Sequence, residues 1–219
     1  MTDPAADSTS QTDSLAALRA LAATEPGLSC AVSDALGRVN GMAYSVAPAW
    51  PGAKLVGRAV TVRPAALDVS AVFRAIALCQ SGDVIVVADA AETDAAYWGE
   101  NASLAAQFRG AAGAIVGAAC RDVAAHARLR FPVFAKGATP RGAAFGEGGE
   151  VQVPIELGGV GVRPGDVIVA DENGVVVIPQ ERLAGVAAAL PAVIERDTAV
   201  QRMLAAGGDL LAARSQKLI

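Results

Sequence analysis

An alternation of short apolar runs and helix-like segments in the middle of the chain most constrains the fold. The apolar runs, rich in Val, Ile and Ala, are residues 55–62, 84–87, 114–116 and 133–135. Helical spacing is found between them, over residues 69–78 and over a segment that starts near Gly99 and includes 104–108. Such alternation is typical of parallel strands joined by crossover helices. The middle of the chain is therefore predicted to form a mostly parallel sheet.

The pattern changes after Pro140, where only strand-like runs are found. They are residues 151–155, 160–162, 167–169 and 175–178, separated by Gly, Pro and Asp turns. A long helix is predicted from Gln180 to Ala206, with an interruption near Pro191, which cannot donate a backbone hydrogen bond. Strands, crossover helices and a closing helix together predict a layered α/β domain of the β/β/α type.

The first residues of the chain differ from the rest in composition. Residues 1–12 are small and polar and are predicted to be a disordered tail. A helix then follows, with Thr12 or Asp13 as its N-cap, and ends at Pro26 and Gly27. The remaining residues, 13–219, are predicted to form a single domain, which is within the usual size range for one core.

Charge and hydropathy limit the classes of partner. The chain has a net charge of −4, and its Lys and Arg residues form no basic run, which argues against a nucleic-acid partner. The N-terminal segment lacks the basic and apolar regions of a signal peptide. No apolar run reaches the roughly 18 residues that a bilayer requires. The sequence thus predicts a cytoplasmic protein that binds neither nucleic acid nor membrane.

Polar residues gather in three segments after apolar strands, which is where open α/β sheets bind ligands. In the first, residues 97–102, Gly99 would open a helix whose free first-turn N–H groups can bind a small carboxylate. The alternative is an ordinary helix start, with Glu100 placed favourably toward the helix dipole. Spacing alone favours the alternative.

The second segment is the adjacent pair Arg121 and Asp122. Asp122 offers a hard oxygen ligand to Mg²⁺ or Mn²⁺, and Arg121 offers several donors to a developing enolate oxygen. Alternatively, Asp122 caps a helix that begins at Val123 and Arg121 is a surface charge. An isolated Arg-Asp pair is a weak signal and favours this second interpretation.

The third segment, residues 134–140, contains Lys136 at the end of a predicted strand. A desolvated lysine there could form a Schiff base, although such lysines more often reach solvent. His126 is the only histidine, so a metal site built from several histidines is impossible. It is expected to be exposed or packed on a helix.

Taken in order, these segments resemble a single family. They read VSDALG (32–37), PGAKLVGRAVTV (51–62), GDVIVV (82–87), WGE (98–100), RD (121–122), PVFAKGATP (132–140), GGV (158–160), RPGD (163–166) and ADENGVVVIP (170–179). The series is similar to the family that contains regulator of ribonuclease E activity A and the 4-hydroxy-4-methyl-2-oxoglutarate aldolases. The resemblance covers about residues 28–205. It implies a swivelling β/β/α fold and a homotrimer, sometimes stacked as a hexamer.

The resemblance also implies a divalent-metal mechanism and a role for each site residue. Asp122 would bind Mg²⁺ or Mn²⁺, and Arg121 would bind the keto oxygen and stabilise the enolate. Glu100 would orient metal-bound water, and either Glu195 or Asp197 of a neighbouring subunit would complete the outer shell. The substrate carboxylate would be held by the amides of Gly99, Glu100, Asn101 and Ala102.

The activity that the resemblance implies is cleavage of 4-hydroxy-4-methyl-2-oxoglutarate-type 4-hydroxy-2-oxo acids to pyruvate. Oxaloacetate decarboxylation would be a side activity. The alternative, from another class, is a non-catalytic protein-binding regulator of ribonuclease activity. The glycine, the glutamate and the Arg-Asp pair occur together, which favours the enzyme. Gly117-Ala118 stand where many members have Asp-Gly, so the substrate is less well defined than the reaction class.

Overall fold

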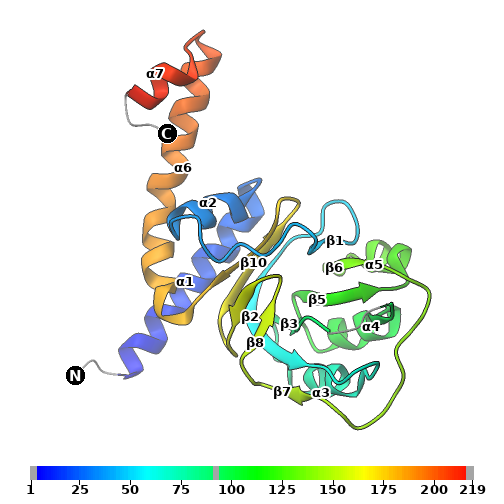
Figure 1. Cartoon of the computed structure of the whole chain (residues 1–219). Coiled ribbons are helices and arrows are strands. Elements are labelled where there is room, and N and C mark those ends of the chain that lie inside the picture. The colour runs from blue at the N-terminus through cyan, green and yellow to red at the C-terminus, as the bar shows by residue number, and fades with distance from the viewer. Residues whose placement is uncertain (1–3, 91–93, 216–219) are drawn as a thin grey trace.

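A nine-stranded mixed sheet forms the centre of the protein in the computed structural model, which describes residues 4–90 and 94–215 (Figure 1). Its strands are β1 (Ala47–Pro48), β2 (Leu55–Arg63), β3 (Asp83–Val87), β4 (Ala96–Trp98), β5 (Gly113–Cys120), β6 (Val133–Ala138), β7 (Glu150–Val151), β10 (Val167–Asp171) and β11 (Gly174–Ile178). Strands β2, β3, β5 and β6 are parallel neighbours, which confirms the predicted parallel centre. Strands β1, β7, β10 and β11 pair in antiparallel fashion, and β4 lies parallel to β5.

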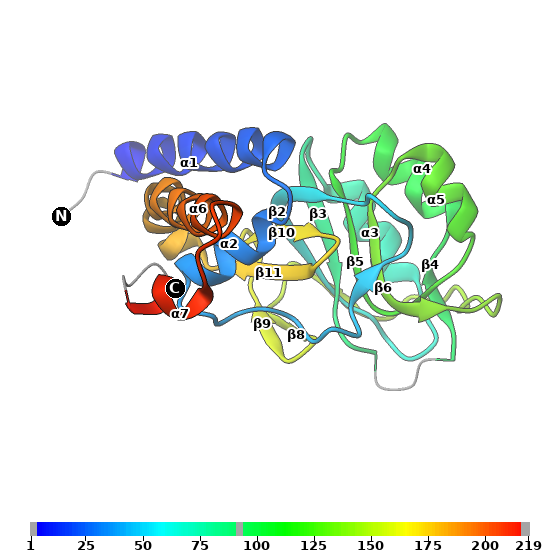
Figure 2. The same cartoon turned by 90° about the horizontal axis from the view of Figure 1, so that it is seen from above.

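Helices cover two regions of this sheet, and a small hairpin covers a third. The helices are α1 (Pro4–Thr24), α2 (Leu28–Ala35), α3 (Ser70–Leu78), α4 (Glu100–Phe108), α5 (Val123–Leu129), α6 (Leu183–Ala205) and α7 (Leu210–Ser215), with a 3₁₀ turn, η1 (Gln180–Arg182). Helices α3, α4 and α5 lie beside β3–β6, whereas α1, α2 and α6 lie at the β10–β11 end (Figure 2). The hairpin is formed by β8 (Ile155–Leu157) and β9 (Val160–Val162).

The buried apolar side chains form three clusters that match these layers. Beneath α3 and α4, the rings of Trp98 and Phe131 stack with centroids 6.1 Å apart. A second cluster lies between the sheet and the β8–β9 hairpin and includes Leu157. The third joins α1 and α6 through Leu18 and Leu190, both fully buried. The first cluster is the one that supports the candidate site.

The N-terminal helix is longer than the sequence predicts. Helix α1 begins at Pro4, so most of the expected tail over residues 1–12 is helical, and residues 1–3 lie outside the described residues. Proline is favoured in the first turn of a helix, and residues 5–24 contain neither Gly nor Pro. The polar composition that suggested a tail is therefore compatible with extension of the helix.

Two further boundaries differ from the prediction. Helix α6 continues through Pro191, so the expected interruption is wrong, and the missing N–H only removes the bond to the Ala187 carbonyl. The run 151–155 forms parts of two strands, because Gln152 adopts a left-handed conformation (φ 58°) and Pro154 follows it.

Among the described helices, none is both long and apolar enough to cross a membrane.

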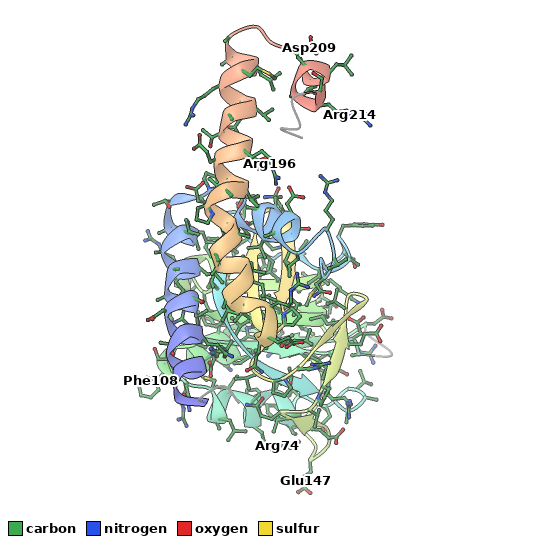
Figure 3. The ribbon with its side chains drawn as sticks, turned by 90° about the vertical axis from the view of Figure 1, so that its left-hand side faces the viewer. Arg74, Phe108, Glu147, Arg196, Asp209 and Arg214 are labelled. Carbon is green, nitrogen blue, oxygen red and sulfur yellow. The ribbon has the colours of Figure 1, made fainter. Side chains whose placement is uncertain are left out.

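The last helices extend away from the sheet. Figure 3 shows α6 running past the body of the protein with Arg196 on its outer half. Helix α7, marked by Asp209 and Arg214, lies beside its far end. Most of the sheet and the helices α3–α5 therefore form a body from which the C-terminal arm projects.

Candidate active site

Two of the three polar segments meet because their strands are neighbours. Trp98 at the end of β4 pairs with Cys120 at the end of β5. The carbonyl of Trp98 accepts a hydrogen bond from the Arg121 N–H at 2.8 Å. Gly99 and Arg121, which follow these strands, are thereby brought side by side. The glycine turn and the Arg-Asp pair therefore lie next to each other.

Asp122 occupies the N-cap position of α5, but its side chain does not cap that helix. Its Oδ2 accepts a hydrogen bond from the N–H of Glu100 at 3.0 Å and lies 3.5 Å from Nε of Arg121. The backbone of Asp122 is left-handed, at φ 57° and ψ 38°. Such conformations are costly for residues other than glycine and are concentrated at functional sites. The alternative interpretation is therefore right about the N-cap position of Asp122 and wrong about its side chain, which makes no capping hydrogen bond.

Arg121 is held between two glycines. A Cβ on Gly99 would lie 2.8 Å from Oδ2 of Asp122 and 3.0 Å from Nε of Arg121. A Cβ on Gly142 would lie 2.6 Å from Nη1 of Arg121. Both distances to Arg121 are closer than an ordinary van der Waals contact, so each glycine leaves the space that the guanidinium fills. The absence of a side chain at both positions allows the Arg121 side chain to lie between them.

The first turn of α4 leaves two backbone donors for a ligand. The helix begins with the bond from the Ser103 N–H to the Gly99 carbonyl, at 3.1 Å. The three preceding N–H groups have no intrahelical acceptor. Asp122 accepts the one from Glu100, which corrects the expectation that it binds substrate. The N–H groups of Asn101 and Ala102 remain available for a carboxylate.

Two adjoining hollows flank Arg121. The larger has a volume of about 360 Å³ and is lined by Arg121, Asp122, Val123, Ala138, Thr139 and Pro140. The smaller, of about 130 Å³, includes Gly99, Asn101 and Ala102 in its lining, together with Arg121. The guanidinium thus borders both the carboxylate of Asp122 and the free amides of α4. A small anionic ligand placed in the smaller hollow could contact the guanidinium and these amides.

The side chain of Glu100 is paired with a residue of α5. Its Oε1 lies against Nη2 of Arg128. Glu100 itself lines neither hollow, and its charge is balanced by this neighbour. Because both side chains keep substantial exposure, this ion pair adds little to stability.

Lys136 lies inside a strand and does not line either hollow. Strand β6 continues to Ala138, so the expected strand end at Lys136 is wrong. The Nζ of Lys136 is 2.8 Å from Oδ1 of Asp89. This ion pair satisfies the ammonium group away from the Arg121–Asp122 pair.

Glu195 and Asp197 lie far from the site within one chain. Both are exposed on α6, and Oε1 of Glu195 accepts a hydrogen bond from Arg202 at 3.0 Å. Helix α6 lies on the opposite side of the protein from α4 and α5 in both views (Figures 1 and 2). Either carboxylate could reach a site of this kind only in another copy of the chain.

The sequence did not reveal the role of His126, which is completely buried behind the site. Its Nδ1 lies 3.0 Å from Oγ of Ser103. Burial disfavours the charged imidazolium and lowers the pKa of His126. Ser103 and His126 each follow a site residue, Gly99 and Asp122, by one helical turn. That spacing is the signal that could have identified them.

The site contains one carboxylate suited to a cation. The contacts of this carboxylate, Asp122, to Glu100 and Arg121 both involve Oδ2, and Oδ1 makes no hydrogen bond within the described residues. In the described part of the chain, no three His, Cys, Asp or Glu residues gather closely enough to enclose a metal ion. Mg²⁺ commonly uses one or two carboxylates and takes its other ligands from water and substrate. Asp122 fits that mode of binding.

The fold and the site define a layered α/β protein with a candidate small-acid site at the carboxyl ends of two parallel strands. A family profile described as RraA-like (Aldolase/RraA) matches residues 29–177. The chain therefore belongs to the RraA-like family, and the predicted membership and fold class are confirmed.

Similar proteins carry both kinds of name found in this family. A protein of Halalkalibacterium halodurans, provisionally named 4-hydroxy-4-methyl-2-oxoglutarate aldolase, is 38% identical over 149 residues, covering 68% of this chain and 71% of that protein. An uncharacterized protein of Pseudomonas syringae matches with a TM-score of 0.77 at 29% identity, covering 86% of this chain and 89% of its own. The RNA-processing inhibitor RraA of Thermus thermophilus matches with a TM-score of 0.62 at 29% identity, and the match covers 67% of this chain and 89% of the Thermus protein.

Proposed function

We propose that this protein is a divalent-metal-dependent carbon–carbon lyase that releases pyruvate from 4-hydroxy-2-oxo acids. The preferred substrates would be of the 4-hydroxy-4-methyl-2-oxoglutarate type, with oxaloacetate decarboxylation as a side activity. One observation carries the proposal. Arg121, Asp122 and the free N–H groups of Asn101 and Ala102 converge on two adjoining hollows. The aldolase name of a relative supports the same reaction class.

The substrate would be held by its 2-oxo acid end. The Asn101 and Ala102 N–H groups would donate to the C1 carboxylate, helped by the positive end of the α4 dipole. The guanidinium of Arg121, which borders both hollows, would donate to the 2-oxo oxygen. These contacts recognise the pyruvate unit that all the proposed substrates share.

In the proposed cleavage, the 4-hydroxyl group gives its proton to water in the site and becomes a carbonyl as the C3–C4 bond breaks. The bonding electrons form the pyruvate enolate, and the proton returned from water to C3 then gives pyruvate. In oxaloacetate the same bond breaks to release carbon dioxide. Arg121 would stabilise the negative charge on the enolate oxygen in a preorganised position, which is where such donors contribute most. Glu100, held by Arg128, would orient water at the edge of the site.

Asp122 would be the protein ligand of a Mg²⁺ or Mn²⁺ ion. When bound, such an ion supplies Lewis-acid stabilisation of developing oxyanion charge. The left-handed backbone at Asp122 and the Glu100 N–H both orient the carboxylate for this role. Metal binding would therefore depend on the same contact that joins α4 to α5.

The test is pyruvate release by the purified protein with Mg²⁺ or Mn²⁺, measured by a coupled assay on 4-hydroxy-4-methyl-2-oxoglutarate and oxaloacetate. Asp122→Ala and EDTA should each abolish turnover. Arg121→Lys should lose rate by about 10²–10³, while binding is better retained, because lysine cannot reproduce the guanidinium geometry. Absence of pyruvate from every substrate with the metal-loaded wild type would reject the lyase.

The second candidate function is non-catalytic regulation of a ribonuclease through protein contacts. The similarity to the Thermus thermophilus protein, which is described as an RNA-processing inhibitor, favours it. A regulator would not need Arg121 and Asp122 to meet two free helix amides. Loss of ribonuclease inhibition in Asp122→Ala is therefore not expected under this function, whereas loss of pyruvate release is expected under the first.

The proposal includes a homotrimer or hexamer with sites at subunit interfaces. Glu195 and Asp197 lie on the projecting α6 and could approach the site of a neighbouring copy. Light scattering should give a mass of three or six chains, and Glu195→Gln or Asp197→Asn should lower turnover without changing that mass. A fully active monomer would contradict this part of the proposal.

A further inference from the structure

A buried chain of three hydrogen-bonded side chains lies directly behind the candidate site. The indole Nε1 of Trp98 donates a hydrogen bond to Oγ of Ser103 at 2.8 Å, and that Oγ lies 3.0 Å from Nδ1 of His126. The three residues are 2%, 0% and 0% exposed. Trp98 ends β4, Ser103 lies in α4 and His126 lies in α5. The chain thus connects the three elements that carry the site.

The direction of the first hydrogen bond follows from the chemistry of its groups. An indole N–H can only donate, so Ser103 Oγ accepts from Trp98. The Ser103 hydroxyl and Nδ1 of His126 share the second contact, whose direction depends on the tautomer of the ring. Within the described residues, Nε2 makes no hydrogen bond, although the lowering of the pKa of His126 by burial is opposed by a backbone contact with Arg121, which acts to raise it.

This side-chain network is coupled to both helix starts. The Ser103 N–H makes the first bond of α4 with the Gly99 carbonyl at 3.1 Å. On α5, the backbone N–H groups of Ala125 and His126 donate to the Asp122 carbonyl at 2.8 and 3.4 Å. Ser103 and His126 therefore lie one turn behind Gly99 and Asp122. A change in the Ser103–His126 distance would change the separation of the two helix starts.

We propose that Trp98, Ser103 and His126 form a positioning relay that sets the distance between the α4 amides and the Arg121–Asp122 pair. Ser103 and His126 line neither hollow, and Trp98 borders only the smaller one, so the three are assigned a positioning role and not a catalytic one. The role rests on the proposed lyase function, because it specifies how the pyruvate unit is held. An apolar side chain at position 126 would avoid the buried, unpaired Nε2, so packing alone does not account for histidine.

The test compares three relay variants with one matched control. Ser103→Ala removes the central hydroxyl, His126→Leu removes the ring nitrogen that contacts it, and His126→Asn retains a hydrogen-bonding group near the position of Nδ1. The control is Ser29→Ala, because Ser29 is 3% exposed and donates to Asp171 at 2.7 Å from the start of α2. Each variant is assayed for kcat and KM of pyruvate release and for oxalate affinity by calorimetry with Mg²⁺. Oxalate is a planar dianion similar to the pyruvate enolate.

Ser103→Ala and His126→Leu should lower kcat/KM by about 10–10², since displacement of about 1 Å can cost 10² in rate. Both should weaken oxalate binding. His126→Asn should stay within a few-fold of the wild type, and so should Ser29→Ala despite its lost buried hydrogen bond. If His126→Leu does not fold, the smaller Ser103→Ala change decides the result.

Three results would overturn the relay. Ser103→Ala could retain wild-type kcat/KM and oxalate affinity, His126→Asn could be impaired as strongly as His126→Leu, or Ser29→Ala could lose as much activity as Ser103→Ala. In each case the active wild type would leave the proposed lyase intact. A wild type that neither binds oxalate nor releases pyruvate would remove both proposals together.

Discussion

Oδ2 of Asp122 accepts the Glu100 N–H at 3.0 Å, and this bond joins the first turn of α4 to the start of α5. Because Arg121 also contacts Oδ2, at 3.5 Å, one oxygen of the carboxylate organises the site. The other oxygen, Oδ1, would bind the proposed cation. The two oxygens therefore have separable structural and chemical roles.

Asp122→Asn should separate these two roles. Asparagine tolerates the left-handed backbone at this position, and its amide oxygen can accept the Glu100 N–H. The melting temperature should therefore stay within a few degrees of the wild type, whereas pyruvate release should fall by at least about 10², because the anionic metal ligand is lost. Asp34→Asn, which changes a surface carboxylate paired with Arg38, is the control. Unchanged turnover in Asp122→Asn would argue against a metal at this residue.

Gly99→Ala should disable the site without unfolding the protein. The new Cβ would lie 2.8 Å from Oδ2 of Asp122 and 3.0 Å from Nε of Arg121, so both side chains must shift. The backbone at Gly99 is extended, which alanine adopts without strain. We expect kcat/KM to fall by about 10² with little change in melting temperature. Gly185→Ala, with open space around its Cβ in α6, should keep wild-type kinetics. Equal kinetics for the two variants would contradict the proposed packing of Arg121.

The order of strands and helices could be predicted because apolar periodicity reports local burial. Residues 160–162 form a strand with the predicted limits, and Ser70–Leu78 differs from its prediction by one residue. The extension of β5 through Gly117 was missed, because a glycine reads locally as a strand end. Glycine is needed at position 117 because of a tertiary contact: a Cβ there would lie 2.6 Å from the backbone of Ala88. Sequence spacing does not report such an approach.

The composition of the site was more predictable than its geometry. Gly99, Arg121 and Asp122 could be proposed because each follows an apolar strand. The left-handed backbone of Asp122 and its bond to Glu100 could not, because both depend on the pairing of β4 with β5. For the same reason, the burial of His126 between helices was not evident from an isolated histidine in an alanine-rich segment.

Lys136 should not form a Schiff base with pyruvate. Its Nζ is paired with Asp89 at 2.8 Å and lines neither hollow beside Arg121. Borohydride reduction in the presence of pyruvate should leave the protein mass unchanged, and Lys136→Arg, which keeps the charge, should retain most of the turnover. A reduced pyruvate adduct mapped to Lys136 by mass spectrometry would replace the metal mechanism with an imine mechanism.

Asp68 should hold the loop of residues 144–149 over the smaller hollow. Its carboxylate accepts the N–H groups of Ser70 at 2.8 Å, Gly146 at 3.0 Å and Gly148 at 2.8 Å. In the same loop, Phe145 stacks on Phe73 with ring centroids 5.2 Å apart, and both rings line the hollow. Asp68→Asn should therefore speed hydrogen exchange at Gly146 and Gly148 and raise KM more than it lowers kcat.

The same variant should change how stability depends on pH. The Ser70 backbone and hydroxyl contacts, followed by the Gly148 N–H, hold the pKa of Asp68 well below its usual range. The unfolded chain binds a proton near pH 3.9, so the carboxylate stabilises the fold above that pH. This contribution is lost as pH falls toward the lower pKa of the folded state. Urea unfolding should show Asp68→Asn less stable than the wild type at pH 7, with the difference narrowing below about pH 4. Asp83→Asn, which removes a carboxylate that accepts the Gln80 N–H in a turn before β3, should leave loop exchange unchanged. A stability difference independent of pH would show that Asp68 acts through its shape rather than its charge.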